Sequence, residues 1–449
     1  MVVGTLLKPM IVMEFRLAVE SGQSGFWKIM LGKIKRDLEQ GRSLMTFASL
    51  QAVGQTFGMV APLVVAKAFS ADLFGSYSLS KMIVFFFAAI LVSASQAPFI
   101  VFASQERTQS GKINRAFTVQ LMFFTLGLCV FAGLALPLSR QMMAFAGINA
   151  GDLLFVLLAF VGLAMEAFVC NLFMAMGERV RSSLVELVFG SSSLGFIIAF
   201  YLGGSISLRT VFLTYILSAL VVLVTFIKAI DFRQLLPLKI DKRYMKDMLT
   251  FTKWIMLGAT ALYFVNWGDN LVLRYYKSMA DIGAYNLGYQ IFKGVVMLAL
   301  IVNSYFLPFV SQHISDGPRM RDYLSRKRPR IFLVGVFCIA LLFLAVPHIF
   351  NFYGGEYREA IAVLRVLLIG SVAVLHTVFY IPILNALKRY RVHQTINVLH
   401  VSLNLFLDLV LVPVMGLLGA AVATTIAYFC QAAMFEIYFR LRLRRLFWQ

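Results

Sequence analysis

The sequence predicts an all-α polytopic membrane protein, in which about twelve transmembrane helices form two parallel six-helix repeats. Its composition, its apolar runs and a repeated pattern support this fold. Of its 449 residues, 60% are hydrophobic and 14% are charged, whereas soluble domains have about 45–50% apolar and about 25% charged residues. The difference is too large for a soluble protein with a big core, so most of the chain is expected to lie in a bilayer.

Twelve apolar runs are long enough to cross a bilayer, for which a helix needs about 20 residues. They are residues 44–67, 78–103, 116–137, 152–176, 183–203, 208–230, 249–274, 284–310, 331–350, 360–386, 393–413 and 416–440. The predicted organisation is a cytoplasmic N-terminal segment with a basic amphipathic helix (1–43), a first six-helix bundle (44–230), a cytoplasmic linker (231–248), a second six-helix bundle (249–440) and a basic cytoplasmic tail (441–449).

The basic residues lie mainly in alternate connections between the predicted spans. Cytoplasmic loops of membrane proteins collect lysine and arginine, and about three quarters of the 41 present here fall on one side if both termini are cytoplasmic. This bias predicts a multi-pass protein with its N- and C-termini in the cytoplasm. It also accounts for the net charge of +20 without a nucleic-acid partner.

A short pattern occurs once in each half of the chain. ADLFGSYSLSKMIVFF (71–86) and ADIGAYNLGYQIFKGV (280–295) share Asp, Gly, Tyr and Leu in the same order. Two halves of six spans in the same orientation form the parallel-repeat layout of secondary transporters, with a path between the halves. The repeated glycines, Gly75 and Gly283, are expected at a tight turn before the even-numbered helix, where a small residue or a positive φ is useful.

Three motifs together resemble a known family. They are FGSYSL (74–79), IGAYNLGYQ (282–290) and LNLFLDLVLVPVMGLLGAAVATTIAYF (403–429). Over residues 28–440 the chain resembles the polysaccharide-transporter branch of the multidrug/oligosaccharidyl-lipid/polysaccharide (MOP) exporter superfamily, the Wzx-type O-antigen flippases. Asp408 departs from the family pattern, which has asparagine or a small polar residue there.

The resemblance implies a flippase, and therefore no enzyme. Its cargo would be an undecaprenyl-pyrophosphate-linked oligosaccharide repeat unit, moved from the cytoplasmic to the periplasmic leaflet of a bacterial inner membrane. The expected mechanism is alternating access of two six-helix bundles around a central cavity, in O-antigen or other surface polysaccharide biosynthesis. The implied partners are this cargo, membrane lipids and other polysaccharide assembly proteins. No cofactor or metal is predicted, because SGKIN (110–114) does not complete a P-loop and the cysteines form no CxxC pair.

Basic residues inside the predicted spans are candidate cargo-binding residues, because a charge costs at least about 2.5–3.5 kcal/mol at the bilayer centre. Lys293 lies about 13 Å below the outer surface at 1.5 Å per residue and could neutralise part of a pyrophosphate; alternatively, it pairs with a buried acid and positions helices. Lys81 and Arg365 are closer to the outer surface and can snorkel. Arg274 is the fourth candidate, although a local ion pair with Asp269 is the favoured interpretation.

Other polar side chains in the spans form two groups. Amides and an indole could bind sugar hydroxyls, or could form interhelical hydrogen bonds: Gln51, Gln55, Asn266, Trp267 and Asn270. The candidates for coupling to H⁺ or Na⁺, or for a charge pair with Lys293, are Glu166, Asp269, Glu186 and His376. Asp408 is expected to face inward near the outer mouth, in a structural role.

Three other functions fit parts of the sequence. A multidrug exporter of the same superfamily would need acids in its cavity to bind cationic drugs, whereas here a lysine is prominent. A membrane polysaccharide polymerase would need sizeable outside loops, and those of this chain are short. A purely structural membrane protein would not need Lys293 or Glu166.

Overall fold

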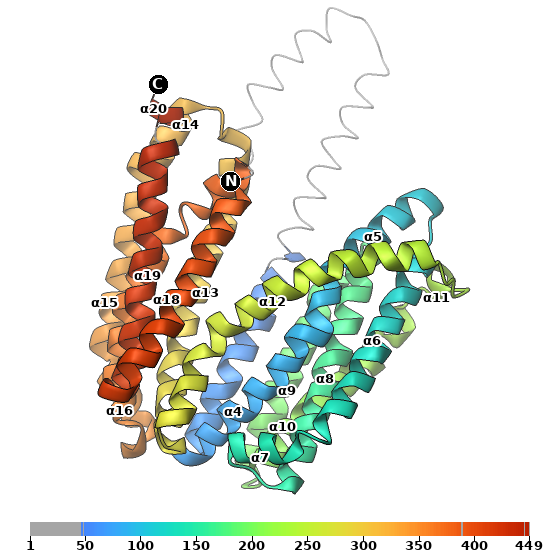
Figure 1. Ribbon diagram of the computed structural model, residues 1–449, viewed down its shortest axis with the longest axis horizontal. Helices are drawn as coiled ribbons and strands as arrows, with labels where there is room; N and C mark the ends of the chain where they lie inside the picture. Colours follow the sequence, from blue (N-terminus) through green and yellow to red (C-terminus); the bar gives the residue numbers. More distant parts are fainter. Residues whose placement is uncertain (1–45, 48, 388, 444, 449) are drawn as a thin grey trace, which may run out of the picture.

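Figure 1 shows a computed structural model of the chain, which describes residues 46–47, 49–387, 389–443 and 445–448; helices joined by short turns make up this part. No strand occurs in these ranges, so the all-α prediction is confirmed. The predicted cytoplasmic segment at 1–43, with its amphipathic helix, lies outside the described residues.

The first half contains six long helical segments and two short helices. They are the helix Ser49–Ala68, the continuous run of α4 (Ala71–Phe87), η1 (Ala88–Ser93) and α5 (Ala94–Ser110), α6 (Asn114–Ala135), short α7 (Ser139–Ala146), α8 (Ala150–Ala175), α9 (Arg179–Leu202), α10 (Leu208–Phe226) with η2 (Ile227–Ala229), and short α11 (Phe232–Leu235). We call this half the first lobe.

The second half, which we call the second lobe, repeats the arrangement. It contains α12 (Lys242–Tyr276), α13 (Met279–His313), α14 (Gly317–Asp322), η3 (Tyr323–Lys327), α15 (Arg328–Tyr353), η4 (Gly355–Tyr357), α16 (Glu359–Thr377), α17 (Ile381–Ala386), α18 (Tyr390–Met415), α19 (Leu417–Tyr438), η5 (Phe439–Leu443) and α20 (Arg445–Trp448).

Eleven helices in the described ranges are long and apolar enough to cross a membrane. Each corresponds to one of the twelve predicted spans. The remaining prediction, 249–274, falls on α12, which is a continuous helix of 35 residues. At 1.5 Å per residue this helix is about 50 Å long, which exceeds the thickness of a hydrocarbon core.

Several helices begin at side-chain caps that the sequence supplies. Asn149, Ser207 and Ser278 each form a capping box at the start of α8, α10 and α13, and Ser70 caps α4. A cap satisfies backbone N–H groups that have no partner within the helix. All four caps lie at the end of the molecule that the charge bias predicts to face outward.

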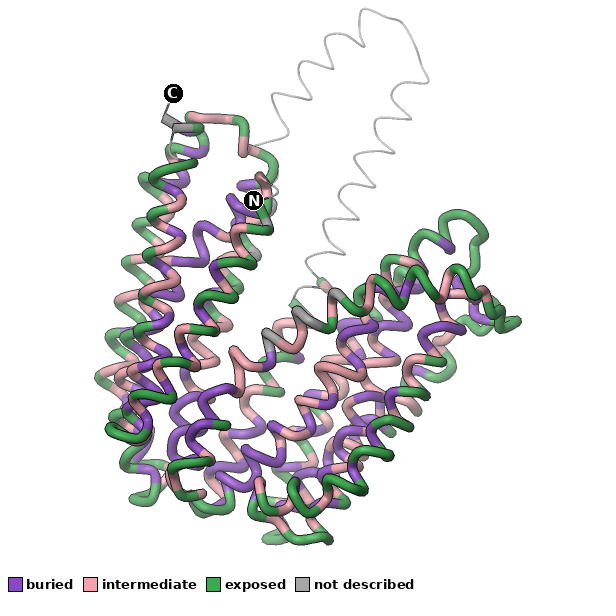
Figure 2. Tube along the Cα trace, in the orientation of Figure 1, coloured by how far each residue is buried: buried purple, intermediate pink, exposed green. Residues whose placement is uncertain are grey.

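The two lobes converge at that outer end and diverge toward the other (Figure 1). Helix α12 connects them: it contacts α5 and η1 of the first lobe and α18 of the second. The linker before α12 is bound to the first lobe, since Asn114 donates to the Pro237 carbonyl at 2.9 Å and the Lys239 N–H donates to Thr118 at 3.0 Å. In Figure 2 the buried residues are concentrated where the lobes meet.

At the outer end, α4 and α13 cross at the two repeated glycines. A Cβ on Gly75 would lie 2.0 Å from the Met279 carbonyl oxygen, and a Cβ on Gly283 would lie 2.0 Å from the Ala71 carbonyl oxygen. Each glycine therefore faces the residue four positions before the other, as two related repeats would place them. The expected tight turn is wrong, because both glycines lie inside helices and neither has positive φ. The need for a small residue is confirmed, but the reason is the close approach of the two helices.

Further contacts close the outer end around this crossing. The Tyr357 hydroxyl lies 3.1 Å from the carbonyl oxygens of both Ala66 and Phe69, at the end of the first helix. Glu356 accepts the Ala71 N–H at 2.9 Å, which caps α4 from the other lobe. Lys67 donates to the Phe352 carbonyl. These bonds join η4 and α15 of the second lobe to the first lobe.

We expect Gly75→Ala to destabilise the protein, because the added methyl group cannot fit at the crossing. Overpacking of this kind costs about 1–3 kcal/mol, so the melting temperature of the purified protein should fall by several degrees. Gly133→Ala in α6 is the matched control, since nothing lies within 4 Å of its Cβ position. Equal melting temperatures for the two variants would contradict the proposed close contact.

Candidate functional site

A cavity of about 370 Å³ lies between the two lobes and contains four of the predicted cargo-binding residues. The first helix, α4 and η1 form one wall, and α12 and α13 form the other. We call it the central cavity. Its lining residues are Met59, Lys81, Phe85, Ala89, Ser93, Ala259, Tyr263, Asn266, Trp267, Gln290 and Lys293.

Lys81 and Lys293 bring one ammonium group from each lobe to the central cavity. The Lys293 Nζ lies 4.6 Å from the ring centre of Trp267 and 4.8 Å from that of Tyr289. The Lys81 Nζ lies 5.6 Å from the ring centre of Phe85. Neither ammonium forms a direct ion pair in the described part of the chain, so aromatic faces are the nearest stabilising groups of both cations. Asp269, a predicted charge-pair candidate, is an electrostatic neighbour of Lys293 without a direct ion pair.

The internal repeat explains why each half of the chain contributes one lysine to the central cavity. At the spacing that relates Gly75 to Gly283, Lys81 corresponds to Tyr289 and Phe85 corresponds to Lys293. Each lobe thus places one lysine and one aromatic ring at two positions one helical turn apart, in opposite order. The lobes are also connected beside the cavity, where Gln290 donates to the Met59 carbonyl at 3.3 Å.

The five predicted sugar-binding residues lie in four different settings. Asn266 and Trp267 line the central cavity. Asn270 is buried and accepts a hydrogen bond of 2.6 Å from Asn286 of α13. Gln51 is a side-chain neighbour of Glu186 of α9. Gln55, one turn further along the same helix, is exposed.

Asp269 and Asp408 form the centre of a buried polar cluster in the second lobe, which we call the acid cluster. Asp269 accepts hydrogen bonds from the Tyr285 hydroxyl, from Thr424 at 3.0 Å and from Asn404 at 3.4 Å. Asp408 is fully buried and accepts from Asn404 at 3.0 Å, while its other oxygen has no partner among the described residues. The cluster joins α12, α13, α18 and α19.

Arg274 and Arg365 lie outside the central cavity. Arg274 donates to the carbonyls of Phe145 at 2.6 Å and Ala144 at 2.8 Å, at the end of α7. The local ion pair with Asp269 that the sequence favoured is therefore wrong. The Arg365 guanidinium lies 5.2 Å from the ring centre of Phe343.

Glu166 and Glu186 lie together in the first lobe, on α8 and α9. Cys170 is 3.8 Å from one Glu186 oxygen, and the other oxygen has no hydrogen-bond partner in the described ranges. Glu166 is an electrostatic neighbour of Glu186. Neither carboxyl group lines the central cavity or pairs with Lys293.

His376 belongs to a charged network at the inner end of the second lobe. Its ring lies 3.2 Å from both Arg328 and Glu436. Glu436 also accepts from Tyr380 and from Arg440. This network joins α15, α16, the turn before α17, α19 and η5, and the half-buried histidine is hydrogen-bonded within it.

The sequence did not reveal which residues form hydrogen bonds with the predicted site residues. Thr424 and Asn404 are ordinary polar residues in apolar spans, and only their meeting with Asp269 distinguishes them. Tyr285 was visible as a repeated residue, but its partner was not. Gln290 lies three residues before Lys293 on α13, so both side chains are on one face of the helix. This spacing could have identified Gln290 as a residue of the same cavity.

We expect Glu436→Gln to destabilise the inner end of the second lobe, because it leaves the Arg328 guanidinium, 16% exposed, without a counter-charge. Loss of one partner from such a partly buried pair should cost about 1–3 kcal/mol, measured by thermal denaturation in detergent. Glu178→Gln, which breaks the more exposed pair with Arg181, should cost less than about 1 kcal/mol. An equal loss in both variants would contradict the structural importance of this network.

The arrangement of two helical lobes is shared with solved membrane transporters. The chain matches the lipid II flippase MurJ in an inward closed conformation with a TM-score of 0.73 and 15% identity, over 90% of this chain and 89% of that one. It matches an inward-facing multidrug resistance MATE family transporter of the MOP superfamily with a TM-score of 0.70 and 12% identity, over 90% of this chain and 98% of that one. The fold is therefore that of the MOP superfamily, as predicted.

Residues 64–361 match the polysaccharide biosynthesis protein family, and the chain belongs to it. A probable low-salt glycan biosynthesis flippase of Haloferax volcanii is 24% identical over 188 residues, which is 41% of this chain and 39% of that protein. An uncharacterized membrane protein of Methanocaldococcus jannaschii is 25% identical over 240 residues, 51% of this chain and 57% of that protein. The matched segments thus cover about two fifths to three fifths of the length of these relatives. The predicted membership of the polysaccharide-transporter branch is confirmed.

Proposed function

We propose that the protein is a flippase that moves an undecaprenyl-pyrophosphate-linked oligosaccharide repeat unit from the cytoplasmic to the periplasmic leaflet of a bacterial inner membrane. The observation that carries this proposal is the pair of ammonium groups, Lys81 and Lys293, at a cavity that both lobes line. An unpaired cation within the membrane is costly, and an anionic cargo supplies its missing counter-charge. The product would serve O-antigen or other surface polysaccharide biosynthesis.

The cavity chemistry matches the head of such a cargo. A pyrophosphate between the two lysines would gain charge-assisted hydrogen bonds from both lobes. The Asn266 and Gln290 amides and the Trp267 indole would bind sugar hydroxyls and a sugar face beside it. Among the residues that the structure describes, no acidic side chain lines the cavity, which disfavours the alternative of a multidrug exporter for cationic compounds.

The shape of the molecule supports alternating access. The lobes are joined at the outer end through the α4–α13 crossing and diverge at the end predicted to be cytoplasmic. An outward-facing conformation of a multidrug resistance MATE family transporter matches with a TM-score of 0.57, below the 0.70 of the inward-facing one. The cargo would enter from the cytoplasmic side, and opening to the periplasm requires the outer contacts to separate.

The acid cluster is the proposed site for a coupling ion, H⁺ or Na⁺. Two carboxyl groups within one hydrogen-bonded cluster cannot both stay ionised without a proton or a cation. Carboxylate, amide and hydroxyl oxygens from Asp269, Asp408, Asn404 and Thr424 suit either ion. Asp269 lies on α12 within one turn of Asn266 and Trp267, so occupancy of the cluster can be transmitted to the central cavity.

A deletion strain tests the flippase proposal directly. It should accumulate cytoplasm-facing lipid-linked repeat units and lose surface polysaccharide, and the wild-type gene should restore both. A Lys81→Gln/Lys293→Gln double variant should transport at least about tenfold more slowly, since each lost charge-assisted hydrogen bond is worth about 1.5–3 kcal/mol. Lys253→Gln removes an exposed lysine of α12 that does not line the cavity and should transport normally. Unchanged surface polysaccharide in the deletion strain would refute the proposal.

The coupling proposal predicts a separate defect for Asp269→Asn and Asp408→Asn. In proteoliposomes, the wild-type rate should respond to a Na⁺ or a pH gradient, because the ion must neutralise the acid cluster in each cycle. Both variants should lose this response while they still bind the cargo at the central cavity. A wild-type rate that is independent of both gradients would refute coupling and leave the flippase proposal standing.

A further inference from the structure

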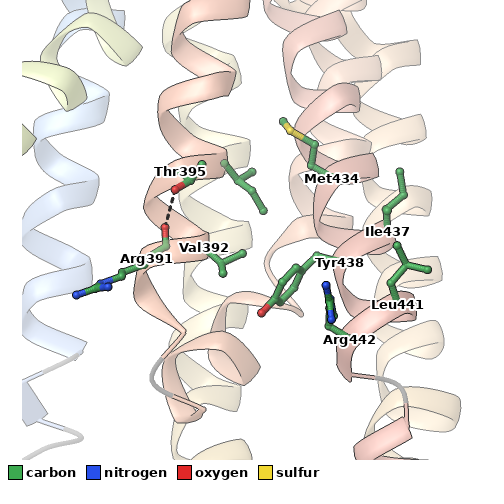
Figure 3. Close-up of a pocket in the computed structure, with 9 residues that line it drawn as sticks. Arg391, Val392, Thr395, Met434, Ile437, Tyr438, Leu441 and Arg442 are labelled. Atoms are coloured by element: carbon green, nitrogen blue, oxygen red, sulfur yellow. Dashed lines mark hydrogen bonds between the residues drawn. The ribbon is translucent and has the colours of Figure 1, made fainter.

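A second cavity, of about 490 Å³, lies between α18 and α19 at the inner end of the second lobe. We call it the inner groove. Figure 3 shows Arg391 on the α18 side and Arg442 beside Tyr438 on the other, with the apolar side chains further along the helices. Its lining residues are Arg391, Val392, Thr395, Ile396, Met434, Ile437, Tyr438, Leu441 and Arg442.

In the described part of its lining, the inner groove combines an apolar wall with two cations and no acid. Ile437 is 56% exposed and Leu441 is 71% exposed, so this wall needs an apolar occupant. Both arginines are exposed, and neither forms an ion pair within the described residues. Tyr438 provides the amphipathic ring that is typical of a membrane interface.

We propose that the inner groove binds an anionic phospholipid of the cytoplasmic leaflet. The charge bias places this end of α18 and α19 at the cytoplasmic surface, where anionic lipids attract basic side chains by about 1 kcal/mol each. The phosphate group binds the Arg442 guanidinium beside Tyr438, and Arg391, whose side chain points away from Arg442 in Figure 3, adds a second positive charge at the same surface. An acyl chain follows Ile396, Met434 and Ile437 toward the membrane centre. This lipid joins two helices that are adjacent in sequence but splayed at this end.

The inner groove is distinct from the route of the cargo. It shares no residue and no helix with the central cavity, which the first helix, α4, η1, α12 and α13 line. A carrier lipid that delivers its pyrophosphate to Lys81 and Lys293 would have its chain beside those helices. The occupant proposed for the inner groove is therefore a membrane phospholipid, and this inference does not depend on the proposed cargo.

Native mass spectrometry of the purified protein tests this site, with phosphatidylglycerol and phosphatidylcholine added in matched amounts. The wild type should retain one phosphatidylglycerol with at least about tenfold preference. Arg391→Gln/Arg442→Gln should abolish the preference. Arg179→Gln/Arg233→Gln, which removes two exposed arginines of the first lobe, should keep it.

A second variant distinguishes the effect of the groove's volume from the effect of its positive charge. Thr395→Trp fills the groove and keeps both arginines, so it should weaken retention of phosphatidylglycerol at unchanged net charge; this variant carries the test if the double arginine variant does not fold. Equal retention of the two lipids by the wild type, or full retention by Thr395→Trp, would overturn the proposal. Displacement of phosphatidylglycerol by an equimolar polyprenyl phosphate would also overturn it, because the groove would then belong to the carrier lipid.

Discussion

The close crossing of α4 and α13 is the contact on which the arrangement of the two lobes depends. Two glycines allow the backbones to approach until a Cβ on either would lie 2.0 Å from a carbonyl oxygen of the other helix. In a membrane, such close packing replaces the hydrophobic effect as the source of helix association. The crossing fixes the outer end, and the same two helices then bring Lys81 and Lys293 to the central cavity further along their length.

The charges inside the membrane are organised in two different ways. The lysines of the central cavity lie over aromatic rings, which stabilise a cation but leave it able to bind an anion. The carboxyl groups of Asp269 and Asp408 are buried among hydroxyl and amide donors, which favours a proton or a small cation as partner. Because α12 carries residues of both sites, a change at one can alter the other through a rigid helix.

Much of this architecture could be predicted from the amino-acid order. The spans were visible because a bilayer requires long apolar helices, and the repeat was visible because Gly75 and Gly283 lie in matching motifs. Lys293, Lys81, Asn266 and Trp267 were identified as charged or polar residues within predicted spans, and they share one cavity. The glycines were misplaced at turns, since a sequence does not distinguish a glycine that bends the chain from one that admits a neighbouring helix.

By itself, the sequence determined that the chain is helical, spans a membrane and contains two related halves, because these properties follow from local hydropathy and repetition. Only the tertiary structure decided which polar residues meet. Arg274 binds the end of α7 rather than Asp269, and Asn404, Asp408 and Thr424 gather around Asp269 from two other helices. The physical reason is that a polar group in a bilayer must find its partner across helices, and the packing of helices distant in sequence fixes that partner.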